Sequence, residues 1–238
     1  MKNVLITGGS RGIGRACVEK FAREGHTVSF IYNNSILAAN ELADKTGAYA
    51  IKADISNPSE ARSAVAAAID RMGGVDILIN NAGISLIKLF TDTTDEEYYN
   101  IMNTNIGGTF FVTREVAKSM VSNHFGRIVN IGSMWGKVGA SCEVAYSASK
   151  SAVEGFTKAL AKELGPSGII VNCVEPGVIN TEMNAELDEN TISELCDATP
   201  VGRIGDANEL AEFIFIIATE KSGFVTGQII GFDGGFAI

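Results

Sequence analysis

The feature that most constrains the fold of this chain is a regular alternation of short apolar runs with longer helical patterns. Seven runs rich in Val, Ile and Leu predict buried strands, at residues 3–7, 27–32, 48–52, 77–80, 127–131, 169–174 and 228–231. Helical periodicity predicts helices at 12–24, 35–46, 58–72, 96–122, 146–164 and 207–219, and we expect the fourth to be bent. This alternation is typical of an α/β fold, a doubly wound Rossmann-type domain with a parallel sheet and helices on both faces.

The 238 residues contain only four Pro and no linker-like or repetitive segment, so we expect a single domain over residues 1–238. Residues 180–200 interrupt the alternation. This stretch has no Lys or Arg and is interpreted as an acidic helical insertion that forms a small lid over the substrate. Its carboxylates are Glu182, Glu186, Asp188, Glu189, Glu194 and Asp197.

Charge and cysteine content exclude several classes of function. With 28 acidic and 19 basic residues the net charge is −9, which disfavours nucleic acids and anionic membranes as partners. Cys17, Cys142, Cys173 and Cys196 lack CxxC spacing and only two His are present, so we expect no metal site. The N-terminal apolar run is too short for a signal peptide and no run approaches the roughly 20 residues of a membrane helix, which predicts a cytoplasmic protein with reduced thiols.

A glycine-rich segment, Thr7-Gly8-Gly9-Ser10-Arg11-Gly12-Ile13-Gly14, joins the first predicted strand to the first predicted helix. In that place glycines allow a tight turn close to a pyrophosphate, and the N–H groups that begin the helix bind the anion. The alternative is a glycine-rich turn without a ligand. The second predicted strand ends at Asn33 without the carboxylate that binds the ribose of NAD, while Arg11 lies in the loop, which favours the 2′-phosphate of NADP. Arg11 as a solvated surface charge is the other interpretation.

A second cluster predicts acid–base chemistry on a carbonyl group. Tyr146 and Lys150 are four residues apart on one predicted helix, and Ser133 follows the fifth predicted strand at the edge where such sheets bind ligands. Lowering a tyrosine pKa from about 10 to about 7 needs roughly 4 kcal/mol, which an ammonium about 4 Å away supplies at an effective dielectric constant of 20. Ser133 would bind the carbonyl oxygen, and Tyr146 would protonate it as hydride arrives from a dihydronicotinamide. Taken alone, the YxxxK spacing is more often structural.

These motifs together identify the chain as similar to the short-chain dehydrogenase/reductase family over nearly its full length. The resemblance rests on residues 7–14, Asp54, Asn80-Asn81-Ala82-Gly83, the set Asn105, Ser133, Tyr146 and Lys150, and residues 176–181. It implies the strand order 3-2-1-4-5-6-7 and a homotetramer built partly through the helices that contain Tyr146 and Ala207.

The resemblance also implies a role for each catalytic residue. Asn105 would bend the long helix and support a proton-relay water, Ser133 would position the carbonyl, Tyr146 would act as general acid/base, and Lys150 would hold the nicotinamide ribose and tune Tyr146. The predicted cofactor-binding residues are Gly8, Ser10, Arg11, Gly12, Ile13, Gly14, Asn33, Asp54, Ile55, Asn81, Ala82, Gly83, Tyr146, Lys150, Pro176, Gly177, Ile179 and Thr181.

Within the family the chain most resembles the 3-oxoacyl-acyl-carrier-protein reductases, through the segments TGGSRGIGRA, YSASK and VTGQIIGFDGG. This likeness implies NADPH-dependent reduction of 3-oxoacyl thioesters in fatty-acid synthesis, with acyl-carrier protein as partner. Two arginines that dock the carrier in such reductases fall at Asn123 and Ser167, which are uncharged. The acidic 180–200 segment would also repel an anionic carrier. Other basic residues are available as a substitute docking patch, or they are ordinary solvated side chains. They are Lys118, His124, Arg127, Lys158 and Lys162.

Other interpretations remain open at this level. The chain would alternatively oxidise or reduce a hydroxysteroid, bile acid or small secondary alcohol, or bind NADP as a scaffold or sensor without catalysis. Trp135 lines an apolar substrate slot with Met134, Val138, Cys142 and Val144, or it packs the loop after Ser133. Glu175 stands where the family has a small residue, and it either acts near the nicotinamide or lies in solvent or against an Arg.

Overall fold

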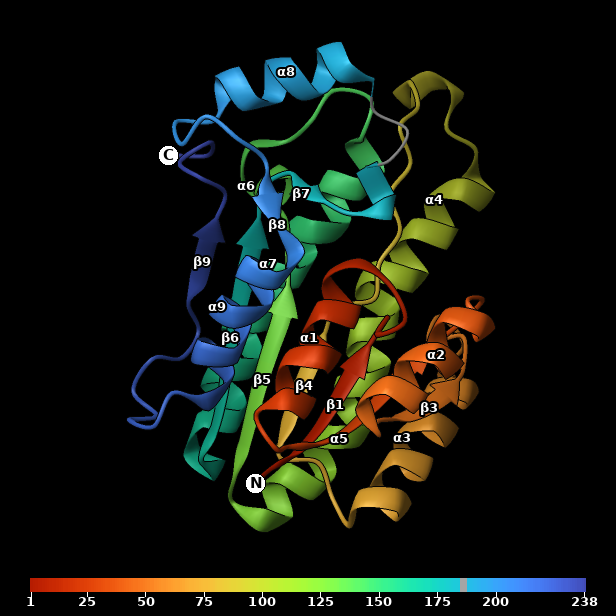
Figure 1. Ribbon diagram of the computed structural model, residues 1–238, viewed down its shortest axis with the longest axis vertical. Helices are drawn as coiled ribbons and strands as arrows, with labels where there is room; N and C mark the ends of the chain where they lie inside the picture. Colours follow the sequence, from red (N-terminus) through yellow and green to blue (C-terminus); the bar gives the residue numbers. More distant parts are fainter. Residues whose placement is uncertain (185–187) are drawn as a thin grey trace.

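The computed structural model of this chain describes residues 1–184 and 188–238 and contains a seven-stranded parallel sheet (Figure 1). The strands are β1 Asn3–Thr7, β2 Thr27–Tyr32, β3 Tyr49–Lys52, β4 Ile77–Asn80, β5 Gly126–Ile131, β6 Ile169–Pro176 and β9 Ile229–Phe232. They lie in the order β3-β2-β1-β4-β5-β6-β9, which confirms the predicted 3-2-1-4-5-6-7 topology with β9 as the seventh strand. The order reverses between β1 and β4, which is where open α/β sheets bind ligands.

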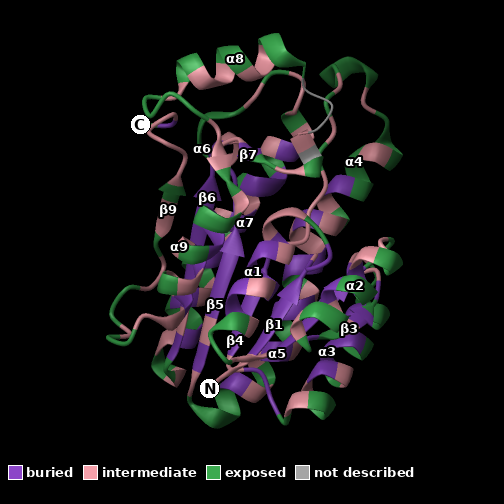
Figure 2. Cartoon of the chain, in the orientation of Figure 1, coloured by how far each residue is buried: buried purple, intermediate pink, exposed green. Residues whose placement is uncertain are grey.

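Helices cover both faces of the sheet because alternate residues of each strand point to opposite sides. Val4 and Ile6 of β1 belong to one buried cluster, with α1 Gly12–Arg23, α2 Ile36–Thr46 and α9 Ala207–Thr219. Leu5 belongs to the other, with α3 Pro58–Met72, α5 Thr109–Asn123 and α7 Val144–Leu164. Figure 2 shows the strands buried between these layers and the outer helix faces exposed. None of the helices in the described ranges is long and apolar enough to cross a bilayer.

The helix predicted at 96–122 is bent, as expected. It consists of α4 Asp95–Met102, a π-helical turn Asn103–Gly108, and α5. Thr94 begins α4 with a capping box to Glu97. A π-turn inserts an extra residue into the helix, which redirects side chains on one face, and Asn105 lies within this turn.

Two features near the carboxyl ends of the strands were not predicted. The short helix α6 Met134–Val138 follows Ser133, and the two-residue strands β7 Ile179–Asn180 and β8 Gly205–Asp206 pair in parallel apart from the main sheet. Between them, α8 Glu189–Ala198 supplies the helical part of the predicted 180–200 insertion and lies beyond the carboxyl ends of the strands (Figure 1). Glu186, one of the six carboxylates of this segment, lies outside the described residues.

Candidate active site

The glycine-rich loop after β1 is bonded to the end of β4. The side-chain amide of Asn81 donates to the carbonyl oxygens of Thr7 and Gly8, at 3.0 and 3.2 Å. The Thr7 hydroxyl accepts from the backbone N–H groups of Asn81 and Ala82, both at 3.0 Å. These bonds fix the loop at the point where the strand order reverses. Thr7 is not among the predicted cofactor-binding residues, although its place at the start of the TGG segment is a signal that identifies it.

The start of α1 fits a dinucleotide pyrophosphate. Arg11 is its N-cap residue, but no side chain of the described chain caps the helix and its first turn contains no acidic residue. The N–H groups that begin α1 are therefore available to an anion. Gly8 and Gly12 adopt φ values of 65° and 50°, which favour glycine, and buried Ser10 lies between them.

Residues 176–181, the last segment predicted to bind the cofactor, reach the start of α1. A Cβ atom at Gly12 would lie 3.4 Å from the Cβ of Thr181, so the structure brings together two predicted cofactor residues that are distant in sequence. Both border a hollow of about 540 Å³ between α1 and the β7–β8 ribbon. Ile179 is buried in the core beside them, and the N–H of Gly177 donates to the carbonyl of Phe232, which holds the segment after Pro176 against β9.

The predicted adenosine residues lie along the ends of β2 and β3. The N–H of Gly9 donates to the carbonyl of Ile31, which places the glycine-rich loop across the end of β2, just before exposed Asn33. Arg11 is exposed and forms no ion pair within 1–184 and 188–238. Asp54 uses one carboxylate oxygen to accept from both the N–H and the hydroxyl of Ser56, at 2.9 and 2.7 Å. Its contact with adenine stays a prediction.

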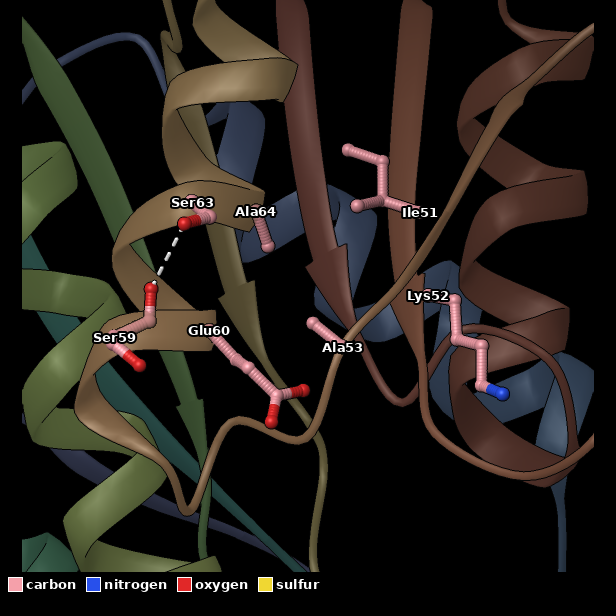
Figure 3. A pocket seen from close by; sticks show the side chains of 7 residues that line it. All are labelled: Ile51, Lys52, Ala53, Ser59, Glu60, Ser63 and Ala64. Atoms are coloured by element: carbon pink, nitrogen blue, oxygen red, sulfur yellow. Dashed lines mark hydrogen bonds between the residues drawn. The ribbon is translucent and has the colours of Figure 1, made fainter.

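Two predicted cofactor residues in this region contribute to the core through their side chains. Ile55 is buried against the π-turn, where a Cβ at Gly108 would lie 2.6 Å from its side chain, and Ile13 packs partly buried against the cluster around α1. A separate hollow of about 230 Å³ lies between the end of β3 and the first turns of α3. Its lining residues, among them Ala53 and Glu60, are drawn in Figure 3. None of the predicted catalytic residues lines it.

Asn105 cross-links three parts of the site. Its side-chain oxygen accepts from the N–H of Ile84 at 2.8 Å, and its amide donates to the carbonyl of Ile84 and the hydroxyl of Ser149, both at 2.9 Å. A Cβ atom at Gly83 would lie 3.3 Å from this Asn105 oxygen and 3.5 Å from Nζ of Lys150. The loop after β4, the π-turn and helix α7 therefore meet at one point, and Ser149 is a supporting residue that the sequence pattern did not indicate.

Lys150 is buried at this junction. Its Nζ donates to the carbonyl oxygen of Ile131 at 2.9 Å and lies 5.7 Å from the centroid of the Tyr146 ring. Burial lowers the pKa of Lys150 to about 8, and the nearby Cys173 acts weakly in the opposite direction. The ammonium is thus held at the carboxyl end of β5.

Tyr146 differs from expectation in the direction of its pKa. Burial raises the pKa of Tyr146 to about 12, the nearby Ser133 hydroxyl lowers it, and the charge of Glu143 raises it. The expected lowering by Lys150 is wrong for this structure, because that ammonium is directed to the carbonyl of Ile131 and desolvation outweighs the charges near the phenol. A neutral phenol is the form that can donate a proton.

Ser133 begins α6, where its Oγ accepts from the N–H of Trp135 at 3.2 Å. Trp135 packs edge-on against Phe236, with ring centroids 5.4 Å apart, and Lys137 donates to the carbonyl of Ala237. The C-terminal tail therefore braces the loop after Ser133, which supports the interpretation of Trp135 as a packing residue. Val138 and Val144 are exposed on the rim of the site.

The proposed basic patch lies mostly at the opposite edge of the sheet. Lys118 pairs with Glu115 and Lys158 pairs with Glu154 on their own helices. Asn123 and Ser167 precede the paired amino ends of β5 and β6, whereas Ser133 follows the carboxyl end of β5. A six-residue strand spans about 16 Å, so in one chain Asn123 and Ser167 lie well away from Ser133.

Comparison with known proteins identifies relatives across nearly the whole chain. Residues 2–192 match the family model described as short chain dehydrogenase. The 3-oxoacyl-[acyl-carrier-protein] reductase of Aquifex aeolicus is 37% identical over 236 residues, covering 97% of this chain and 95% of the relative. The acetoacetyl-CoA reductase of Shinella zoogloeoides is 38% identical over 232 residues, covering 97% and 96%. A solved 3-ketoacyl-(acyl-carrier-protein) reductase of Brucella melitensis, complexed with NADH, superposes with a TM-score of 0.93 at 31% identity and covers 100% of this chain and 98% of its own.

Proposed function

This chain belongs to the short-chain dehydrogenase family, whose members are oxidoreductases acting on CH–OH or keto groups, and we propose that it reduces a 3-oxoacyl thioester to the 3-hydroxyacyl thioester with NADPH. The observation that carries this proposal is the convergence of Ser133, Tyr146 and Lys150 at the carboxyl edge of the sheet, beside the glycine-rich loop. Ser133 follows β5 and the other two lie on α7, and all three side chains are buried near one another.

In the proposed mechanism the substrate oxygen lies between Ser133 and Tyr146. The Ser133 oxygen accepts from Trp135, and its hydroxyl hydrogen, which faces Tyr146, bonds the carbonyl oxygen of the substrate. Neutral Tyr146 donates its proton to that oxygen as negative charge develops on it. Lys150 supplies positive charge at the end of β5, and Asn105 holds the loop after β4 against α7. A bound nicotinamide dinucleotide supplies the hydride.

The names of these two relatives share one chemical unit, a 3-oxoacyl thioester, and differ in its carrier. That shared unit supports a thioester substrate. The second candidate substrate is a neutral ketone, either an oxosteroid or the ketone that corresponds to a small secondary alcohol. The described acidic residues of the 180–200 segment favour it, because they would disfavour an anionic carrier. Glu182, Asp188, Glu189, Glu194 and Asp197 are all exposed or partly exposed there.

The substrate is tested by following loss of NADPH absorbance with acetoacetyl groups carried on acyl-carrier protein, on coenzyme A and on a short pantetheine mimic, with free ketones in parallel. We expect turnover on at least one thioester that exceeds turnover on every free ketone. A higher rate on carrier protein than on the mimic would identify the carrier as a partner. Activity restricted to free ketones would contradict the thioester assignment and leave the family chemistry intact.

We propose that Arg11 selects NADPH through the 2′-phosphate. Replacing Arg11 with Ala is expected to lower kcat/KM for NADPH roughly 10- to 100-fold, since a hydrogen bond to a charged group contributes about 1.5–3 kcal/mol. The kcat/KM for NADH should change by less than about twofold, because NADH lacks the 2′-phosphate. Arg23→Ala, at the other end of α1, serves as the control. Equal losses for the two nucleotides would show that Arg11 does not discriminate between them.

We further propose a cytoplasmic homotetramer of single-domain subunits in which the described residues of the 180–200 segment cover the substrate site. Large exposed apolar side chains support subunit contacts: Phe110 at the start of α5, and Phe224 and Ile216 near α9. Cys17 and Cys173 are buried free thiols, as expected of a protein in a reducing compartment. Sedimentation at several concentrations tests the oligomeric state.

A further inference from the structure

Glu175, at the end of β6, is a buried carboxyl group without an assigned function. It is 3% exposed, and its Oε1 is fully buried without a hydrogen-bond partner in the described chain. An ionised carboxylate in such surroundings is strongly unfavourable unless donors or cations satisfy it. The expectation that Glu175 lies in solvent is therefore wrong, and no Arg forms an ion pair with it within the described ranges.

The Glu175 side chain fills a space directly beneath the catalytic loop. Because side chains alternate along a strand, Glu175 lies on the same sheet face as Val171, which packs in the cluster that contains α7. A Cβ atom at Gly132 would lie 3.0 Å from Cγ of Glu175 and 3.4 Å from its Oε1. Gly132 directly precedes Ser133, so the Glu175 carboxyl group touches the loop that contains a predicted catalytic residue. Glu175 also directly precedes Pro176, the first residue of the predicted cofactor segment 176–181.

Glu154 faces Glu175 from helix α7. It lies one turn beyond Lys150, its side chain is 17% exposed, and its Oε2 is 3.5 Å from Nζ of Lys158. The two carboxyl groups are within hydrogen-bonding reach of each other. Two carboxylates repel at this distance, whereas a proton between them turns the contact into a strong, charge-assisted hydrogen bond. A shared proton therefore accounts for a carboxyl group that no other donor satisfies.

The remaining groups around Glu175 do not remove the need for this proton. Lys137 of α6 and Lys158 of α7 favour its ionised form, but burial and Glu154 outweigh them and raise the pKa of Glu175 to about 7. Cys173, on the same strand face, stays neutral because burial raises its pKa to about 12. Gly132, which follows β5, lies against Glu175, and Gly231 of β9 pairs with Glu175 in register. The Asp233 carboxylate lies near Gly231 and accepts from the N–H groups of Gly235 and Ala237.

We propose that Glu154 and Glu175 share one proton, and that this acid pair is a positioning device that holds helix α7 against the ends of β5 and β6. Glu154 is on the helix that presents Tyr146 and Lys150, and Glu175 supports the residue before Ser133. Loss of the proton places two like charges between the helix and the sheet, which loosens the alignment of these groups. The shared proton itself does not depend on the proposed substrate, and only the effect on turnover rests on the proposed function.

The sign of the pH effect follows from the raised pKa. The folded state holds the proton more tightly than the unfolded chain, so the contribution to stability is fully present below about pH 4.5 and is lost as the pH rises through about 7. A glutamine at position 175 retains a donor to Glu154 but carries no titrating proton. The Glu175→Gln variant is therefore expected to match the wild type at pH 6 and to lose less stability between pH 6 and pH 8.

The decisive experiment is carbon-13 NMR of the full chain labelled at glutamate side-chain carboxyl groups. We expect one resonance step near pH 7 in the wild type, absent from Glu175→Gln and retained in the control Glu163→Gln, an exposed position on the same helix. In Glu154→Gln the step should move to lower pH, because burial alone then raises the pKa of Glu175. If Glu175→Gln does not fold, Glu154→Gln provides the same test. A wild type in which every glutamate titrates below about pH 5, a step near pH 7 that survives in Glu175→Gln, or a step that does not move in Glu154→Gln overturns the shared proton.

Urea unfolding and turnover then test the positioning role. The urea midpoint of the wild type should fall from pH 6 to pH 8 by more than that of either Gln variant, a comparison that needs no substrate. For whichever carbonyl substrate is turned over, kcat should show a step near pH 7 in the wild type that Glu175→Gln lacks and that lies at lower pH in Glu154→Gln. Identical kcat profiles would contradict the positioning role even if the shared proton is observed, whereas absence of turnover on every carbonyl would contradict only the proposed function.

Discussion

Replacing Tyr146 with Phe is expected to lower turnover by about 10²- to 10⁴-fold, the range that a positioned general acid contributes. The variant loses only the phenolic hydroxyl, and the buried ring keeps its packing beside Lys150. Because burial raises the pKa of Tyr146 to about 12, this hydroxyl is protonated at neutral pH and can supply the proton that reduction of a carbonyl requires. Single-turnover and steady-state loss of NADPH absorbance measure the effect.

Nucleotide binding should be unchanged in this variant within about twofold, which separates a chemical role from a structural one. Tyr98→Phe, which removes an exposed hydroxyl on α4, is the matched control and should retain the wild-type rate. A Tyr146→Phe enzyme with a near-normal rate would show that another group protonates the substrate oxygen, and the mechanism proposed for this site would fail.

Replacing Gly14 with Ala is expected to weaken dinucleotide binding at least tenfold and to destabilise the fold by about 1–3 kcal/mol, as overpacking of a tight site does. A Cβ atom at this position would overlap the carbonyl oxygen of Gly8 and lie 2.6 Å from the side-chain amide nitrogen of Asn81. The same amide donates to Thr7 and Gly8, so relief of the overlap has to separate the glycine-rich loop from β4. Fluorescence titration with NADPH and urea unfolding measure the two effects.

Arg15→Ala, at the next position of α1, is the control for this prediction. Arg15 pairs with Glu19 and Glu41 on the surface, and such ion pairs contribute at most about 1 kcal/mol. If Gly14→Ala preserves dinucleotide binding and stability as well as Arg15→Ala does, the glycine-rich loop accommodates a side chain. Its tight contact with β4 would then not be required for cofactor binding.

The positions of the site residues relative to one another have a consequence for the carrier. Asn123 and Ser167 lie at the amino edge of the sheet and Ser133 at the carboxyl edge, separated by the length of β5. A carrier that docks at that amino edge would have to bridge the length of β5, about 16 Å, to present its thioester to the site of the same chain. If carrier protein proves to be the preferred form of the substrate, a surface near α8 or a site on another subunit of the proposed tetramer would shorten that path.

The sequence by itself determined the elements of the sheet and most of the helices. The predicted bounds of β1, β2, β4, α3 and α9 agree with the structure, because hydrophobic periodicity and helix-ending residues act locally. Helical periodicity predicted a bent fourth helix, and resemblance to the family then supplied the strand order and placed the bend at Asn105. The short elements α6, β7 and β8 were missed, since two to five residues are too few to establish a period.

Only the tertiary structure decided which polar groups satisfy one another. Sequence spacing placed Tyr146 and Lys150 on one helix face, but the ammonium bonds the carbonyl of Ile131, and burial moves the pKa of the phenol upward. Glu154 and Glu175 are 21 positions apart and neither pattern nor spacing connects them. Their contact arises because α7 packs on the end of β6, and the free energy of a buried charge depends on the groups that packing brings around it.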